Sequence, residues 1–199
     1  MTFAVRPIGL VASGKEWLFV GVTGVQQDTS WTYPATPQAG DLAIVACRLP
    51  SPYTLPSGFT QLVNFEQSAF YRVCVGGETS VARPSISITQ GVVALFRPVG
   101  GAVSVGDGAR LITGGAVSSL AAGTGPGLLI GAATDGNGSV WNLGSQTETG
   151  VLGGFIANGN PAWRAFYGLY PEGSSPTNLQ QVTNFSSSPT QAYRLFGIT

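Results

Sequence analysis

Glycine, proline, serine and threonine recur every few residues along this chain, which contains 29 glycines and 13 prolines. Between these residues, apolar side chains alternate or form short runs, and they do not repeat at the spacing of an amphipathic helix. No helix of useful length can be written. The sequence therefore predicts an all-β protein, folded as an antiparallel β-sandwich of jelly-roll-like type.

Turn-forming residues divide the chain into short segments that favour β-structure. Proline and glycine clusters at Pro50, Pro56, Gly76 and Gly100 mark several of the boundaries. Many short, β-branched and aromatic segments at this spacing are typical of a sandwich or barrel. We expect strands at residues 17–22, 42–49, 60–65, 69–75, 85–89, 92–99, 117–121, 128–133, 150–156, 164–170 and 193–198.

Two of these segments are apolar on both faces. Residues 42–49 and 92–96 carry apolar side chains at nearly every position, so neither face is suited to water. Strands with this pattern are covered on both sides. We therefore expect these two strands near the middle of the core.

A weak internal echo divides the chain into two halves, residues 1–99 and 100–199. Three segments recur in the same order, at offsets of 86, 96 and 100 residues: 40–46 with 126–132, 69–78 with 165–172, and 93–96 with 193–196. We interpret residues 1–199 as a single sandwich domain with pseudo-repeated halves, and a boundary near residues 98–101. Two small sandwiches packed together, or chance similarity between β-strands, are the alternatives.

Charge is scarce and histidine is absent. Only 9% of the residues are charged, and nine basic residues balance nine acidic ones. Without histidine, the chain has no Ser-His-Asp or Cys-His nucleophile system and no imidazole metal ligand. It also lacks the basic patch of a nucleic-acid-binding protein. Near-zero net charge favours association, which indicates a protein that works inside an assembly.

The acidic residues do not form a recognisable catalytic or metal-binding pattern. Glu78 and Glu172 occupy matching places in the two halves, but both lie in turn segments, where side chains are usually solvated. The loop that begins at Asp135 resembles a calcium loop only at its start, because Val140 and Gln146 replace the required glycine and glutamate. We expect no catalytic residue, no metal and no cofactor, and hence no enzyme.

Aromatic residues are the remaining chemical resource. Trp31, Tyr33 and Tyr53 lie in proline-rich connections, and Trp141 follows an Asp-Gly-Asn-Gly turn. Exposed rings at such places could stack on a glycan or anchor a protein interface. The alternative is that they cap the ends of the core, as most aromatic side chains in such domains are buried. Trp17 and Trp163 adjoin strand segments and are expected in the core.

The chain shows no recognisable targeting or membrane segment. Arg6 and Pro7 interrupt the apolar start, so a secretion signal is not expected. The uncharged stretch 111–134 contains a Gly-Pro-Gly turn and fits two strands better than a membrane span. A protein that starts in the cytoplasm is expected to keep Cys47 and Cys74 as free, buried thiols.

Four motifs together resemble a known family. They are Pro37-Gln-Ala-Gly40-Asp41-Leu42-Ala-Ile-Val-Ala, Pro56-Ser-Gly58-Phe59-Thr60-Gln-Leu62, Ala69-Phe70-Tyr71-Arg72-Val73 and Val93-Ala-Leu-Phe96-Arg97. This series is similar to a pattern in β-sandwich virion proteins of tailed bacteriophages and of phage-like gene transfer agents. The resemblance covers residues 30–99 well and the rest loosely. Phe59 stands where the pattern usually has tryptophan.

The resemblance implies a structural role on a particle. The expected function is a non-enzymatic virion component, with a head decoration or spike protein favoured over a tail, baseplate or fibre component. The implied location is the virion, assembled in the host bacterial cytoplasm. The implied partners are other virion proteins, further copies of the chain and a host-surface glycan, without nucleic acid or membrane insertion. A carbohydrate-binding β-sandwich is the alternative function.

Overall fold

The computed structural model describes residues 14–47, 54–63, 69–84, 90–111, 117–119, 125–133, 140–142, 148–157, 160–174, 177–182 and 191–199. Within these ranges every regular element is a β-strand, and every strand pair is antiparallel. Two five-stranded sheets contain most of these strands. The expected all-β sandwich class is therefore confirmed.

The first sheet is built from the first half of the chain. Its strand order is β1 (Glu16–Val22), β7 (Gly91–Val99), β3 (Leu42–Cys47), β5 (Ala69–Val73) and β4 (Thr60–Gln61). A separate pair, β2 (Ser30–Thr32) and β6 (Ser80–Ala82), forms a small second layer.

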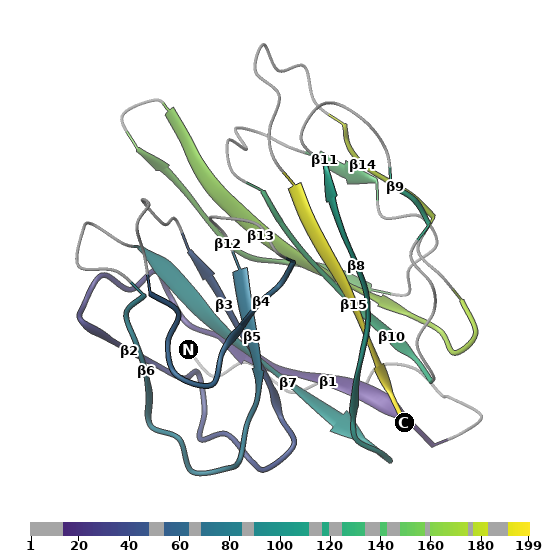
Figure 1. The fold of residues 1–199 in the computed structure, drawn as a ribbon, viewed down its shortest axis with the longest axis horizontal. Helices are drawn as coiled ribbons and strands as arrows, with labels where there is room; N and C mark the ends of the chain where they lie inside the picture. The colour runs from purple at the N-terminus through teal and green to yellow at the C-terminus, as the bar shows by residue number, and fades with distance from the viewer. Residues whose placement is uncertain are drawn as a thin grey trace.

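The second sheet is built from the second half, as the teal-to-yellow strands of Figure 1 show. Its order is β12 (Glu148–Ala157), β13 (Asn160–Tyr170), β10 (Gly127–Ala133), β15 (Gln191–Ile198) and β8 (Val103–Leu111). A small sheet of β11 (Val140–Asn142), β14 (Thr177–Val182) and β9 (Val117–Ser119) completes the strands.

The main core lies between the two five-stranded sheets. Leu42, Ile44 and Phe96 of the first sheet belong to the same buried cluster as Leu128 and Ile130 of the second. Aromatic rings from both sheets meet there, and Tyr167 packs on Phe96 with ring centroids 5.2 Å apart. Burial of these apolar side chains is the main favourable term that holds the two halves together.

A second buried cluster covers the opposite face of the first sheet. Ala43, Val45 and Val93 point into it, and Trp31 of β2 and Val81 of β6 close it from outside. Strand β3 is consequently buried at all its positions. The expectation that these strands are covered on both sides is confirmed for residues 42–47 and 92–96, while residues 48 and 49 lie outside the described residues.

Several short strands escaped the sequence interpretation. Strands β2, β6, β11 and β14 were not expected, nor was β8, in which Gly106, Asp107 and Gly108 hide the apolar alternation. Such strands form because a neighbouring strand offers hydrogen bonds, and this information is not local in sequence. The expected strand at residues 85–89 lies outside the described residues.

The two sheets have the same internal order. Read from β8, the second sheet runs β8, β15, β10, β13, β12, and the first sheet runs β1, β7, β3, β5, β4. When the strands of each sheet are numbered in chain order, both sheets are arranged first, fifth, second, fourth, third. The registers also match at the three offsets. Leu42 pairs with Phe96 as Leu128 pairs with Phe196, and Ile44 pairs with Tyr71 as Ile130 pairs with Tyr167.

Candidate functional site

A cluster of polar interactions lies where β3 begins. Residues 38–41 form a tight turn in which the Asp41 amide donates to the Gln38 carbonyl at 3.1 Å. Gly40 is the third residue of this turn and has a φ of 91°, a conformation that favours glycine. The Gly40-Asp41 pair thus sets the direction in which the chain enters the first sheet.

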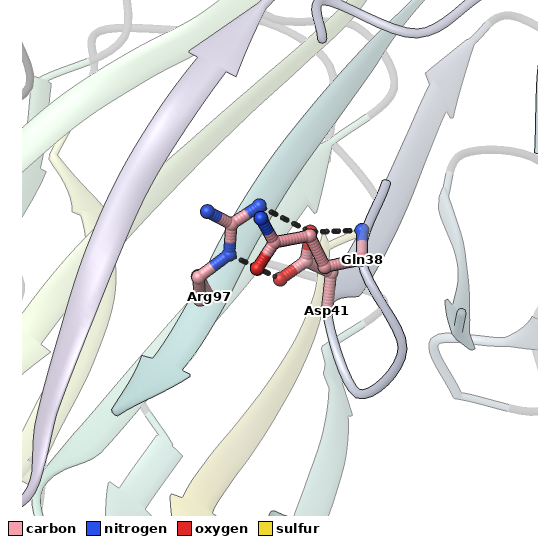
Figure 2. Close-up of polar contacts among 3 residues, drawn as sticks. All are labelled: Gln38, Asp41 and Arg97. Carbon is pink, nitrogen blue, oxygen red and sulfur yellow. Dashed lines mark hydrogen bonds and ion pairs between the residues drawn. The ribbon is translucent and has the colours of Figure 1, made fainter. Parts of the chain in front are cut away.

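The Asp41 carboxylate accepts three hydrogen bonds. The Arg97 guanidinium of β7 donates through Nε to Oδ1 at 2.8 Å and through Nη2 to Oδ2 at 2.9 Å. The backbone amide of Gln38 donates to Oδ2 at 2.8 Å, as Figure 2 shows. The Asp41 side chain is 1% exposed and that of Arg97 is 28% exposed. This two-pronged pair ties the start of β3 to β7.

A second ion pair holds the chain after β5. Glu78 accepts hydrogen bonds from the backbone amides of Val75 and Gly76, and its Oε1 lies 2.9 Å from Arg72 Nη2. The Arg72 guanidinium carbon lies 6.0 Å from the centre of the Phe59 ring. Arg72 therefore connects the turn before β4 to the turn after β5.

Backbone hydrogen bonds join these two loops to each other. Cys74 donates to the Asp41 carbonyl at 2.7 Å, Gly40 donates to the Cys74 carbonyl at 2.9 Å, and Gly77 donates to the Pro37 carbonyl at 2.9 Å. A side chain at Gly76 would stand 3.0 Å from the Ala39 nitrogen, so the approach requires glycine. The loops form one rigid end of the first half.

Protonation equilibria fit a structural role for this end. Burial acts to raise the pKa of Glu78, but backbone hydrogen bonds and the Arg72 charge outweigh it and hold that pKa below 4.5. The hydrogen bond to Asp41 raises the pKa of Arg97. A general acid needs a raised carboxyl pKa, so Glu78 is unsuited to the acid role in glycoside hydrolysis.

Both cysteines are free and buried. Burial is the main cause that raises the pKa of Cys74 to about 12, and it also raises the pKa of Cys47. Cys74 lies beside Asp41, whereas Cys47 lies six residues further along β3, about 20 Å away at the usual rise of an extended strand. A disulfide needs Cα atoms within about 7 Å, so the two thiols do not bridge.

The candidate aromatic residues do not form an exposed site. Of the two interpretations left open for these rings, the structure supports core capping for Trp31, which is 0% exposed, and for Tyr33, which is 9% exposed, because both pack on the outer face of the first sheet. Their faces are covered, so neither ring can stack on a sugar. Among the described residues, Trp31 Nε1 and the Tyr33 hydroxyl have no hydrogen-bond partner.

The other candidates are placed only in part. Trp141 lies in β11, opposite Gln181, and its side chain is not among those described. Tyr53 lies outside the described residues, as does the Asp135 loop. Trp17 is buried in the main core, as expected, and its indole Nε1 donates to the Pro126 carbonyl at 2.9 Å.

The described residues hold no group of three or more histidine, cysteine, aspartate or glutamate side chains arranged for a metal ion. Glu172 is exposed in the turn after β13, while Glu78 is engaged with Arg72. Among the described residues, no helix is long and apolar enough to cross a membrane.

Sequence reasoning treated the charges as isolated and missed the Asp41–Arg97 and Arg72–Glu78 pairs. Asp41, Arg72 and Arg97 are in the motifs that carry the phage resemblance, whereas Glu78 is not. Which of these residues meet in the folded chain depends on the strand register. A useful signal was available: a charged residue at the end of each of two strands that are apolar on both faces.

Comparisons of the chain with protein-family models, with curated proteins and with solved structures find no match.

Proposed function

We propose that this chain is a non-enzymatic structural component of a tailed bacteriophage or phage-like particle, and within the particle a head decoration or spike protein. One observation carries the proposal. The motif residues that resemble virion proteins contact one another in the folded chain: Asp41 binds Arg97, and Arg72 lies against Phe59. Motifs of this kind serve the fold and not a reaction.

The chemistry of the described residues supports a role without catalysis. The buried thiols are protonated at neutral pH, because burial raises the pKa of each of them. Glu78 and Asp41 are both held by arginine side chains. The strongest polar interactions therefore stabilise loops.

Low charge supports a role in assembly. Burying a charge in an interface is costly unless it is paired, and only 9% of this chain is charged. A rigid sandwich with few unpaired charges can associate through its surface at a small desolvation cost. Closed symmetry then multiplies weak contacts between copies.

The proposal is tested on particles released by the producing cell. Particles are purified by density gradient, probed with an antibody against the chain, and imaged by cryo-electron microscopy. We expect the chain to co-purify with the particles and to account for density on the head surface. Density confined to the tail would move the assignment to a tail, baseplate or fibre component. Absence of the chain from intact particles would overturn the proposal.

A carbohydrate-binding function loses two of its four candidate residues, because the Trp31 and Tyr33 rings are buried. A glycan array with the full chain, repeated with Trp141→Ala, tests what remains. No described contact favours this function over the structural one.

A further inference from the structure

The two halves of this chain agree in more than their strand order. When the three sequence offsets are applied to the paired central strands, each of nine inward-facing positions of the first sheet corresponds to one inward-facing position of the second. Six of these pairs are identical: Leu42 and Leu128, Ile44 and Ile130, Ala46 and Ala132, Ala69 and Ala165, Tyr71 and Tyr167, Phe96 and Phe196.

The outward-facing positions of the same strands behave differently. Only Phe70 with Phe166 and Leu95 with Leu195 are identical there. The other outward pairs differ in size, charge or both, as in Arg72 with Gly168 and Arg97 with Gly197. Identity is thus concentrated on the face that each sheet turns toward the other.

The sheets are stacked as a two-fold rotation would place them. Strand β7 contacts β12, and β3 contacts β13, so the β1 edge of one sheet lies over the β12 edge of the other. At the opposite side, Tyr71 of β5 packs on Phe196 of β15 at 5.0 Å, and a Cβ at Gly108 of β8 would meet Val63, just after β4. The inner face of each half therefore packs against its own equivalent.

From this arrangement we infer that the inner face of the first half, residues 14–100, is an interface that fits a second copy of the same half. In a two-fold interface each face must complement itself, and this constrains both copies. That constraint explains why identity is kept inside. The outer faces are covered by different residues and are free to differ.

At the β8 edge of the sandwich, a second copy would place larger side chains than the second half does, and Val22 at the place of Gly108 would require Val63 to move. Trp17 and Phe19 of β1 occupy the register positions that Val103 and Val105 occupy in β8. Val105 is 45% exposed, and Val73 of β5 is 43% exposed. In a pair of first halves, Trp17 and Phe19 of the second copy would stand where the smaller valines are now.

The test begins with the full chain, carrying a specific protease site between Gly100 and Gly101. The folded protein is cut, unfolded in urea and refolded by dilution, with and without a fivefold excess of isotopically labelled first half. Native mass spectrometry then separates the mixed pair from pairs of first halves. We expect the cut protein to reassemble one to one, and the excess to produce pairs of first halves.

Two results would overturn the inference. One is that the halves do not reassemble after cutting. The other is that the first half pairs only with the second half and stays single in excess. As a matched control, Ile44→Asp on the inner face should abolish both kinds of pair, whereas Val75→Asp, at a position 74% exposed, should leave them intact.

A permuted chain gives an independent measurement. Side chains built at Gly100 and Gly101 would collide with Gly14 and Thr199, so both ends of the described chain lie at the linker between the halves. Residues 101–199 followed directly by 1–100 should fold with the native circular dichroism spectrum and one cooperative melt. A permuted chain without a cooperative transition would contradict the expectation that the two halves can be joined either at residues 100 and 101 or at the two chain ends.

Discussion

The Asp41–Arg97 pair yields a prediction about the order of effects in a mutant series. Asp41 is the deeper partner, with its side chain 1% exposed, and Arg97 is 28% exposed. Arg97→Ala leaves a buried carboxylate with only the Gln38 amide as a partner. Breaking a buried pair in this way costs about 3–5 kcal/mol.

Asp41→Ala has a smaller expected cost because the remaining guanidinium can turn toward water. The loss of charge-assisted hydrogen bonds corresponds to about 2 kcal/mol. The double variant removes the stranded carboxylate as well, so it should match Asp41→Ala and be more stable than Arg97→Ala. Since about 1 kcal/mol shifts the melting temperature by roughly 2–4 °C at this chain length, the differences are measurable.

The assay is urea unfolding at pH 7, monitored by circular dichroism, with Glu172→Ala as a control at an exposed turn. The control should lie within about 0.5 kcal/mol of the parent. The reasoning fails if Asp41→Ala costs as much as Arg97→Ala, or if the double variant is the least stable of the three. Either result would mean that burial of the carboxylate does not dominate the energetics of the pair.

Three further predictions concern other described contacts. The pKa of Glu78 is lowered in the folded chain, so its carboxylate stabilises the fold above the ordinary value of 4.5, and this effect is lost as pH falls through the folded pKa. The melting temperatures of the parent and of Glu78→Gln should therefore converge below about pH 4.5. Cys47 and Cys74 should be almost unreactive toward a thiol reagent at pH 7 until urea unfolds the chain; rapid native labelling would contradict their burial. Gly91→Ala should destabilise by about 1–3 kcal/mol in urea unfolding, because its Cβ would lie 2.6 Å from Cys47 Cβ and 2.7 Å from the Ala46 oxygen, whereas Gly24→Ala has open space and should be nearly neutral.

The local pattern of the sequence was sufficient for the fold class and the central strands. Residues 42–47 and 92–96 are apolar at nearly every position, and this pattern has the same meaning wherever the strand lies. The echo at residues 40–46 and 126–132 likewise needs no knowledge of contacts. These features depend on hydrophobicity, which acts without direction.

The site depended on information that local sequence does not contain. Asp41 and Arg97 are 56 residues apart, and they meet only because β3 pairs with β7 in one register. Trp31 lies in a three-residue strand between turn segments, and the local sequence left both an exposed and a buried ring open. Its burial follows from the position of β2 and β6 over the first sheet, which is a tertiary property.

The two halves also differ in charge at their corresponding ends. On the inferred alignment, Asp41, Arg72 and Arg97 of the first half correspond to Gly127, Gly168 and Gly197 of the second, and all three glycines are buried. Glycine has no side chain that could form an ion pair, whereas the first half closes its end with ion pairs. A surface for association would therefore differ between the halves: the ion-paired end of the first half is polar and rigid. On the particle proposed above, contacts with neighbouring proteins would then distinguish two halves whose inner faces share six of nine residues.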